Sequence, residues 1–252
     1  MGRGGTLAVV PRPPHQQKKP RKPKPKPQAP PLLRVDGLRR RFGEVDVLAG
    51  FDLEVRAGEA VALVGRNGAG KSTVLRCVTG ADTPTGGSVE LDGKPLDERS
   101  EQVRSDLAVV MDDMDFFPDL SVVEHLDLFA KAHRVADPQA LVDDVLHEVG
   151  LVAQAAQRPG TLSSGQRRRL ALASAFVRPR RLLVLDEPEQ RLDSAGLDWL
   201  AERLVREKAQ GLAVLMASHA TGLVEAVADR VVDVGAHRGA PLGTGPDDGG
   251  KA

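Results

Sequence analysis

Cysteine, aromatic residues and long apolar runs are all scarce in this sequence of 252 residues. It has one cysteine and no tyrosine, and aromatic residues make up only 3% of it. The lone Cys77 excludes a disulfide within the chain, and a reducing compartment is its natural setting. No run approaches the roughly 18 to 20 apolar residues that a membrane span requires, and the apolar residues 7–10 are too few for the core of a signal peptide. We expect a cytoplasmic protein that does not itself cross a membrane.

Net charge is absent as well, because 35 basic residues balance 35 acidic ones. That balance conceals an asymmetry, since residues 1–34 hold nine of the basic residues and none of the acidic ones. Within them, residues 11–31 alternate proline with lysine and arginine, a composition that cannot bury apolar surface. We predict a disordered basic tail over residues 1–31. It is either a solvated linker or a contact with anionic lipid or RNA, with about 1 kcal/mol per basic residue near an anionic membrane.

From residue 32 onward, short apolar runs alternate with glycine and aspartate, and hydrophobic residues reach 41% of the chain. Residues 33–35 and 51–55 alternate apolar and polar side chains with the period of a half-exposed strand. The unbroken apolar residues 60–64 suit a buried strand. Further strands are predicted at residues 88–91, 181–185 and 213–217, and helices at residues 122–133, 139–149 and 197–208. This alternation predicts an α/β domain with a parallel core, interrupted by a mostly helical insert over about residues 97–180.

The strongest motif lies between a predicted strand and a predicted helix. It consists of Gly65, Arg66, Asn67, Gly68, Ala69, Gly70, Lys71, Ser72 and Thr73, and it fits the P-loop pattern in full. Glycines allow the backbone to wrap phosphate oxygens, and the following helix presents its positive dipole end. Lys71 would neutralise phosphate charge and Ser72 would ligate Mg²⁺. The motif predicts binding of a nucleoside triphosphate.

Two carboxylates follow the apolar strand predicted at residues 181–185. A buried strand of a parallel sheet delivers the residues at its carboxyl end to the edge where ligands bind. Asp186 is therefore a candidate to hold Mg²⁺ through water, and Glu187 is a candidate to orient and polarise the attacking water. Two acids after a strand are otherwise an ordinary exposed turn, and the P-loop is what favours the functional interpretation.

A third motif, Leu162 followed by Ser163, Ser164, Gly165 and Gln166, precedes a helical run over residues 167–177. It resembles the LSGGQ signature of the ABC ATPases, and it stands shortly before the two carboxylates, as in that family. Ser163 is well suited to cap the helix. The hydroxyl and the free amides of the first turn would then form a site for an anion.

The resemblance to ABC ATPases covers about residues 32–235. It implies a P-loop NTPase fold of α/β class, with an antiparallel β subdomain beside the parallel core and a helical subdomain at about residues 97–180. Residues 236–252 would be a flexible C-terminal tail. The resemblance further implies that ATP with Mg²⁺ is bound between the P-loop of one protomer and the signature of a second one. The dimer would be homomeric or heteromeric, and it would dock on separate transmembrane permease subunits from the cytoplasmic face.

Further residues match positions of the ABC family. Phe42, followed by Gly43, matches the aromatic residue that stacks on adenine, although a buried core phenylalanine is the alternative. His219, after the strand predicted at residues 213–217, matches the switch histidine that contacts the γ-phosphate. Leu192 and Asp193 match the loop that contacts the partner protomer.

Three departures from the family pattern stand out. Asp112 occupies the position of a glutamine that links ATP to the transmembrane partner; its carboxylate can still ligate Mg²⁺, but it adds negative charge beside a phosphate. Ser164 replaces the first signature glycine, which either weakens closure of the dimer or donates another hydrogen bond. The run Glu189, Gln190 and Arg191 replaces small residues, so that the dimer contact there is expected to change.

We favour the ATPase subunit of a transporter whose membrane-spanning chains are separate polypeptides. A soluble ABC ATPase acting on ribosomes or nucleic acid is the alternative that the basic tail supports, but a single cassette without a long coiled-coil insertion makes it the less favoured one. A regulatory half-site with weak hydrolysis is the third. Lys71, Asp186, Glu187 and His219 argue against it, whereas Asp112 and Ser164 keep it open. The transported substrate and the direction of transport are not encoded in these residues.

Overall fold

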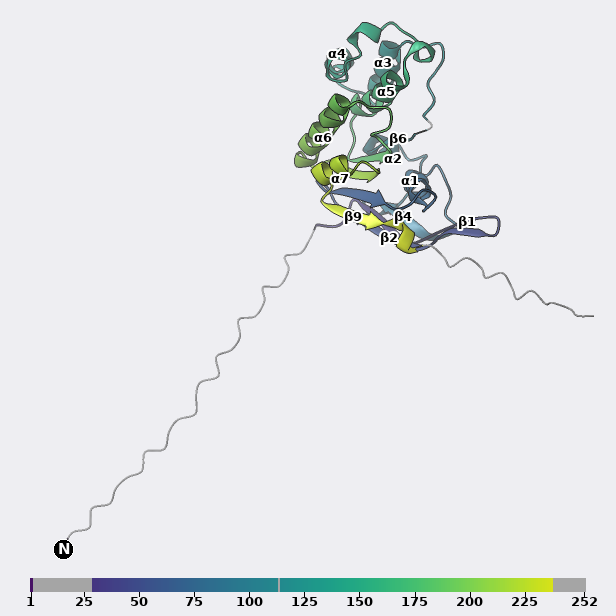
Figure 1. Ribbon diagram of the computed structural model, residues 1–252, viewed down its shortest axis with the longest axis vertical. Coiled ribbons are helices and arrows are strands. Elements are labelled where there is room, and N and C mark those ends of the chain that lie inside the picture. The colour runs from purple at the N-terminus through teal and green to yellow at the C-terminus, as the bar shows by residue number, and fades with distance from the viewer. Residues whose placement is uncertain (2–28, 113, 238–252) are drawn as a thin grey trace, which may run out of the picture.

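The computed structural model of the chain describes Met1, residues 29–112 and residues 114–237. The predicted basic tail and most of the predicted C-terminal tail lie outside these residues, as does Asp113. The described part contains two sheets and a group of helices. Helices α3 (Val122–Ala132), α4 (Pro138–Glu148) and α5 (Ser164–Phe176) lie at the end farthest from the antiparallel sheet (Figure 1).

The core of the molecule is a parallel sheet whose strand order is β6-β7-β8-β3-β9. Its strands are β3 (Ala60–Val64), β6 (Leu107–Val110), β7 (Leu182–Asp186), β8 (Ala213–Ala217) and β9 (Arg230–Asp233). Every residue of β7 and of β8 is buried. The predicted strands at residues 60–64 and 213–217 are confirmed, because unbroken apolar runs suit strands covered on both faces.

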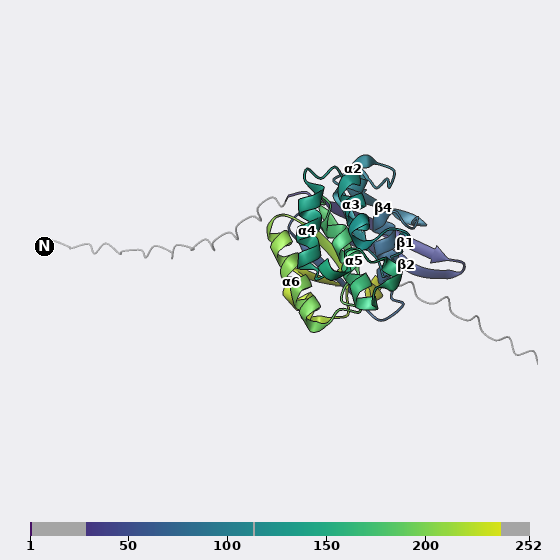
Figure 2. The same cartoon turned by 90° about the horizontal axis from the view of Figure 1, so that it is seen from above.

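The second sheet is antiparallel, with the strand order β2-β1-β4-β5. It consists of β1 (Leu33–Phe42), β2 (Val45–Val55), β4 (Gly86–Leu91) and the short β5 (Lys94–Pro95). The pairing of β1 with β2 shifts register three times, and such irregularities bend and twist a hairpin. The β1–β2 hairpin projects from one side of the molecule in both ribbon views (Figures 1 and 2).

Helices cover both faces of the parallel sheet. They are α1 (Lys71–Thr79), α2 (Glu101–Asp106), α3 (Val122–Ala132), α4 (Pro138–Glu148), α5 (Ser164–Phe176), α6 (Ser194–Ala209) and α7 (Thr221–Val227). Short 3₁₀ turns lie at Val152–Gln154, Pro159–Thr161 and Val234–His237. The predicted helices at residues 122–133, 139–149 and 197–208 are therefore confirmed, with boundaries shifted by a few residues.

Two strands of the parallel sheet have no counterpart in the sequence analysis. β6 lies inside the range 97–180 that was assigned to the helical insert, yet it pairs in parallel with β7. Its apolar run, residues 107–111, follows directly on helix α2, and periodicity alone does not separate a short buried strand from a buried helical segment. β9 alternates partly buried with exposed residues and closes the other edge of the sheet.

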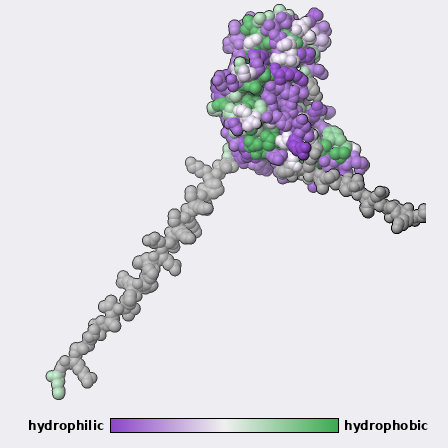
Figure 3. Space-filling model, in the orientation of Figure 1, coloured by the Kyte–Doolittle hydropathy of each residue, from purple (hydrophilic) through white to green (hydrophobic). Residues whose placement is uncertain are grey.

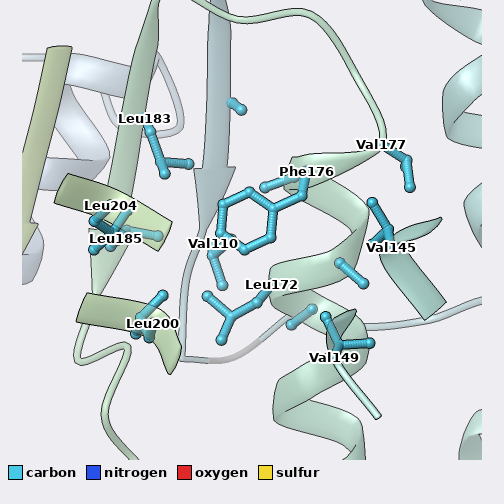
Figure 4. Close-up of a cluster of buried hydrophobic side chains, with 14 of the residues drawn as sticks. Val110, Val145, Val149, Leu172, Phe176, Val177, Leu183, Leu185, Leu200 and Leu204 are labelled. Atoms are coloured by element: carbon cyan, nitrogen blue, oxygen red, sulfur yellow. The ribbon is translucent and has the colours of Figure 1, made fainter. Parts of the chain in front are cut away.

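Alternate residues of β3, β6, β7 and β8 enter two different apolar clusters. Leu182 and Val184 pack with α1 and the antiparallel sheet. Leu183 and Leu185 point to the opposite face, where they pack with helices α3 to α7. Figure 4 shows this second cluster, in which Leu172 and Phe176 of α5 lie between the sheet residues and Val145 and Val149 of the helical part. The same core therefore joins the helical part to the sheet.

The surface is predominantly hydrophilic on the face shown in Figure 3, with small hydrophobic patches between charged side chains. Among the described residues, no helix has the length and apolar character needed to cross a membrane. Cys77 is buried and unpaired, and burial raises the pKa of its thiol to about 11. A thiol with that pKa is a poor nucleophile, so Cys77 is a core residue.

We predict that Leu172→Ala lowers the free energy of unfolding by about 2 to 5 kcal/mol, because it opens a cavity between the helices and the sheet. Leu172 is fully buried, whereas Leu128 on α3 is 43% exposed and makes a matched control. Leu128→Ala is expected to cost roughly 0.5 kcal/mol or less. Urea unfolding followed by circular dichroism measures both. Equal losses in the two variants would contradict the described packing.

Candidate functional site

The residues that follow three strands of the parallel sheet lie at the same edge of that sheet. The P-loop follows β3, Asp186 and Glu187 end β7, and His219 follows β8. β8 pairs with β7 on one side and with β3 on the other. His219 is thereby placed between the P-loop and the two carboxylates. This edge is where open α/β sheets bind their ligands.

The P-loop leads into α1 through glycines with positive φ. Gly70 has φ 102° and caps the helix, and a Cβ at this position would lie 3.0 Å from Leu48 Cδ2. Only glycine fits both the conformation and the space. The first turn of α1, beginning at Lys71, presents its backbone N–H groups at the sheet edge as an anion-binding end.

The Lys71 ammonium is buried among acceptors. Its Nζ donates to the carbonyl oxygen of Gly65 at 3.0 Å and lies 3.5 Å from that of Arg66. Nζ is also 3.0 Å from Nε2 of His219. Nε2 of His219 is in turn 3.6 Å from Oε1 of Glu187. The candidate residues Lys71, His219 and Glu187, which come from three different strands' ends, thus form one continuous row.

Asp186 is buried beside the P-loop. The Ser72 hydroxyl hydrogen-bonds to its carboxylate, while Oδ1 is buried and has no partner among the described residues. Burial raises the pKa of Asp186; the hydrogen bond from Ser72 opposes this shift, and the charges of Glu187 and Asp112 add to it. A carboxylate oxygen without a partner next to a hydroxyl fits the oxygen donors that a hydrated Mg²⁺ requires.

No group of three or more His, Cys, Asp or Glu that could hold a metal was found among the described residues. A metal at this edge would therefore depend on Asp186, the Ser72 hydroxyl, water and substrate oxygens. Asp112, the other candidate ligand, has Oδ1 3.5 Å from a guanidinium nitrogen of Arg191. In this structure the Asp112 carboxylate forms an ion pair with Arg191.

Glu187 has a backbone conformation that non-glycine residues rarely adopt, with φ 44°. Such left-handed conformations cost about 1 to 2 kcal/mol. The Glu187 amide donates to the carbonyl oxygen of Ala217 at 2.8 Å, and the Gln190 side-chain amide donates to Oε2 of Glu187. These bonds fix the carboxylate, with Oε1 on the side of His219.

Arg168 on α5 stabilises the turn that contains Glu187. Its guanidinium donates to the carbonyl oxygens of Asp186 and Glu187, both at 2.6 Å, and to that of Met111 at 3.1 Å. Burial lowers the pKa of Arg168, since only 3% of the residue is exposed. From the sequence, Arg168 was only part of the predicted helical run over residues 167–177. A cation at one of the buried positions of that run was the signal that could have revealed its role.

The signature begins α5 as predicted. Ser163 is the N-cap and accepts from the amide of Gln166 at 3.2 Å, while the Gln166 side chain accepts from the Ser163 amide at 2.9 Å. A Cβ on Gly165 would lie 2.8 Å from the carbonyl oxygen of Arg191, so glycine is required there. Ser164 is exposed and lines a pocket of about 470 Å³ together with Asp112 and Arg191. The Ser164 side chain, which replaces the first signature glycine, therefore fits without a clash.

Two other predicted residues lie apart from the row formed by Lys71, His219 and Glu187. Phe42 ends β1, is 47% exposed and has the guanidinium of Arg40 4.3 Å from its ring centroid. It is therefore not a buried core residue, and its ring already accepts a planar cation. Asp193 caps α6 by accepting from the Gly196 amide at 2.9 Å and pairs with Arg169.

The family model described as "ABC transporter" matches residues 48–190, which include the P-loop, the signature and both carboxylates. The chain belongs to the ABC transporter family. The aliphatic sulfonates import ATP-binding protein SsuB of Pseudomonas putida is 40% identical over 215 residues, which is 82% of this chain and 76% of the relative. This relationship and the motifs together show an ATP-binding subunit that hydrolyses ATP to power a membrane transporter.

Solved structures of ABC subunits share the fold. One described as the ATP binding subunit of an ABC transporter has a TM-score of 0.75 at 29% identity and covers 81% of this chain and 87% of its own. The dimeric bacterial ABC cassette MJ0796 has a TM-score of 0.72 at 22% identity, over 81% of this chain and 95% of its own. At that identity the second likeness shows the fold alone. The predicted combination of parallel core, antiparallel sheet and helices is confirmed.

We predict that Asp186→Asn raises the free energy of unfolding by about 1 to 2 kcal/mol at pH 7, because it removes a buried charge without a full set of partners. It should abolish ATP hydrolysis at the same time. The pKa of Asp186 is raised in the folded state, so the wild type loses stability only above the pKa of an unfolded aspartate. The stability difference should therefore shrink as the pH falls from 7 towards about 4.

Thermal unfolding across this pH range measures the difference. Asp143→Asn, at an exposed position of α4, is the control and should leave stability unchanged. A variant less stable than the wild type at pH 7, or a difference independent of pH, would contradict the burial penalty.

Proposed function

We propose that this cassette binds ATP with Mg²⁺ between its own P-loop and the signature of a second cassette, and that Glu187 activates the attacking water. The observation that carries the proposal is the row Lys71, His219 and Glu187, with separations of 3.0 and 3.6 Å. Taken in this order, the Lys71 ammonium suits the charge of the γ-phosphate, the His219 imidazole suits a hydrogen bond to one of its oxygens, and the Glu187 carboxylate suits the attacking water.

Each side chain of the row would have a separate role in the transfer. The water oxygen forms a bond to the γ-phosphorus while the bond to the oxygen bridging to ADP breaks. Oε1 of Glu187 accepts a hydrogen bond from the water and takes up its proton. Lys71 compensates the charge on the phosphate oxygens, exchanging its contacts with the Gly65 carbonyl and His219 for phosphate. His219 would then donate to the γ-phosphate.

The metal would supply charge neutralisation at the β- and γ-phosphates. Ser72 and Asp186 would hold it, directly or through water, since they already share a hydrogen bond beside an unpartnered carboxylate oxygen. Asp112 would approach it only after leaving its ion pair with Arg191. Phe42 would stack on the adenine, in place of the cation that now lies on its ring.

The signature residues Ser163, Ser164, Gly165 and Gln166 would serve the ATP of the partner protomer. They begin a helix of 13 residues whose N-cap side chain is exposed. Its first turn offers the amides and the hydroxyl that a γ-phosphate from outside the chain requires. Closure of two cassettes around two ATP molecules would be driven by ATP and reversed by hydrolysis.

The names of the relatives support an importer in which the permease consists of separate chains. The matched protein SsuB is called an import ATP-binding protein. We therefore propose a position on the cytoplasmic face of the membrane, with helices α3 and α4 in the subdomain that docks the permease and with a contact between the basic tail and anionic lipid. Nucleic acid is not a proposed partner, because the names of the family and the relatives favour a membrane transporter over the alternative that the basic tail supports.

Mixed dimers test whether the site is shared between protomers. Glu187→Gln keeps its own signature but cannot activate water, whereas Ser163→Arg keeps Glu187 but blocks the anion end of α5. Each variant alone should hydrolyse ATP at less than about 5% of the wild-type rate, because one lost catalytic group costs 10² or more. A mixture should recover well above either, since a heterodimer contains one intact composite site.

Phosphate release is measured at fixed total protein over a range of mixing ratios, with Glu187→Gln also checked by light scattering for a dimer in ATP. No recovery at any ratio, with both variants folded and dimer-forming, would contradict a composite site. An inactive wild type that still binds ATP would point instead to a regulatory half-site.

A further inference from the structure

The run Glu189–Gln190–Arg191, which departs from the family pattern, contacts three functional segments of its own chain. Gln190 donates to the carboxylate of Glu187. Arg191 pairs with Asp112. Glu189 binds the loop that carries His219. The predicted change in the contact with the partner protomer stays a prediction, and within the chain all three side chains contact the candidate catalytic edge.

Glu189 makes the most extensive of these contacts. Its Oε1 accepts hydrogen bonds from the Ser218 hydroxyl at 2.9 Å, from the His219 amide at 2.7 Å and from the Ala220 amide at 3.2 Å. A carboxylate oxygen that receives three donors is a strong, charge-assisted acceptor. One atom of Glu189 therefore fixes the backbone on both sides of His219.

The backbone of this loop depends on that acceptor. β8 ends at Ala217, and α7 begins at Thr221 with no side-chain cap on its first turn. The bond between the Ser218 amide and Leu63 is long, at 3.4 Å. The imidazole of His219 is 44% exposed, so packing alone does not hold it in place. The backbone position set by Glu189 therefore decides how far Nε2 lies from Lys71 and Glu187.

The other carboxylate oxygen of Glu189, Oε2, bears on whether Glu189 positions His219 or transfers a proton itself. Oε2 is buried and has no partner among the described residues. Oε1 is occupied by three donors and Oε2 by none that the structure describes. Neither oxygen therefore hydrogen-bonds to the side chains of Lys71, His219 and Glu187. Glu189 acts on that row only through the backbone amides of residues 219 and 220 and the Ser218 hydroxyl.

We propose that Glu189 is a positioning residue that holds His219 in register with Lys71 and Glu187 for ATP hydrolysis. The proposal rests on the role proposed above for His219. The partners of Glu189 are two backbone amides and one hydroxyl, all of them uncharged donors, so an uncharged acceptor of the same shape retains most of the function. Glutamine supplies such an oxygen, aspartate withdraws it by one methylene, and alanine removes it.

The test is steady-state ATP hydrolysis by the full chain, with thermal unfolding measured for each variant. Glu189→Ala is expected to lower kcat roughly ten-fold to a hundred-fold, because small displacements of a catalytic group have effects of this size. The KM for ATP should stay within about two-fold, since the P-loop is unchanged. Glu189→Gln should retain at least about a third of kcat, and Glu202→Ala, at an exposed position of α6, should match the wild type.

A second background shows whether the effect passes through His219. In His219→Ala protein, Glu189→Ala should lower the residual turnover by less than about two-fold, because the group that it positions is gone. Single-turnover release of labelled phosphate measures these low rates. Should Glu189→Ala fail to fold, Glu189→Asp replaces it, with a smaller loss of kcat and the same dependence on His219.

Two results would overturn the role of Glu189 while leaving that of His219 in place. One is a folded Glu189→Ala with the kcat of the wild type while His219→Ala is inactive, which removes only the role of Glu189. The other is an equal loss in both backgrounds, which shows that Glu189 acts elsewhere. A fully active His219→Ala would instead remove the proposed role of His219, and the positioning role with it.

Discussion

The guanidinium of Arg168 joins three parts of the molecule that are far apart in the sequence. It leaves the first turns of α5 and donates to carbonyl oxygens at the ends of β6 and β7, including that of Glu187. The left-handed backbone at Glu187 is unfavourable by itself, and these hydrogen bonds make it the stable arrangement. The Glu187 carboxylate and helix α5 therefore have a fixed relation within one protomer.

That relation explains why glycine is needed at the second signature glycine position. The backbone of residue 191 approaches Gly165 so closely that a Cβ would lie 2.8 Å from a carbonyl oxygen. Helix α5 and the turn that follows Glu187 are thus in direct contact. A change of one is transmitted to the other without any intervening segment, as expected of close-packed elements.

Much of the fold and the centre of the site could be predicted because both depend on local patterns. Unbroken apolar runs marked β3, β7 and β8, and polar residues at their carboxyl ends marked the edge where Lys71, Glu187 and His219 meet. β6 and β9 could not be predicted in the same way, since β6 follows directly on a helix within the range assigned to the helical insert and β9 is half exposed. The contacts of Glu189 and Arg191 join residues 29 to 31 and 79 positions apart, and no local pattern encodes them.

Because aromatic residues are scarce, the molecule has a single intrinsic indole fluorophore. Trp199 on α6 is the single tryptophan of a chain without tyrosine. Its ring meets that of Phe176 on α5 edge to face, with centroids 5.8 Å apart. Because α5 begins with the signature and ends at this ring pair, the emission of Trp199 reports the environment of the signature helix without any label. A shift in its wavelength on nucleotide addition would report a change in the packing of α5 against α6.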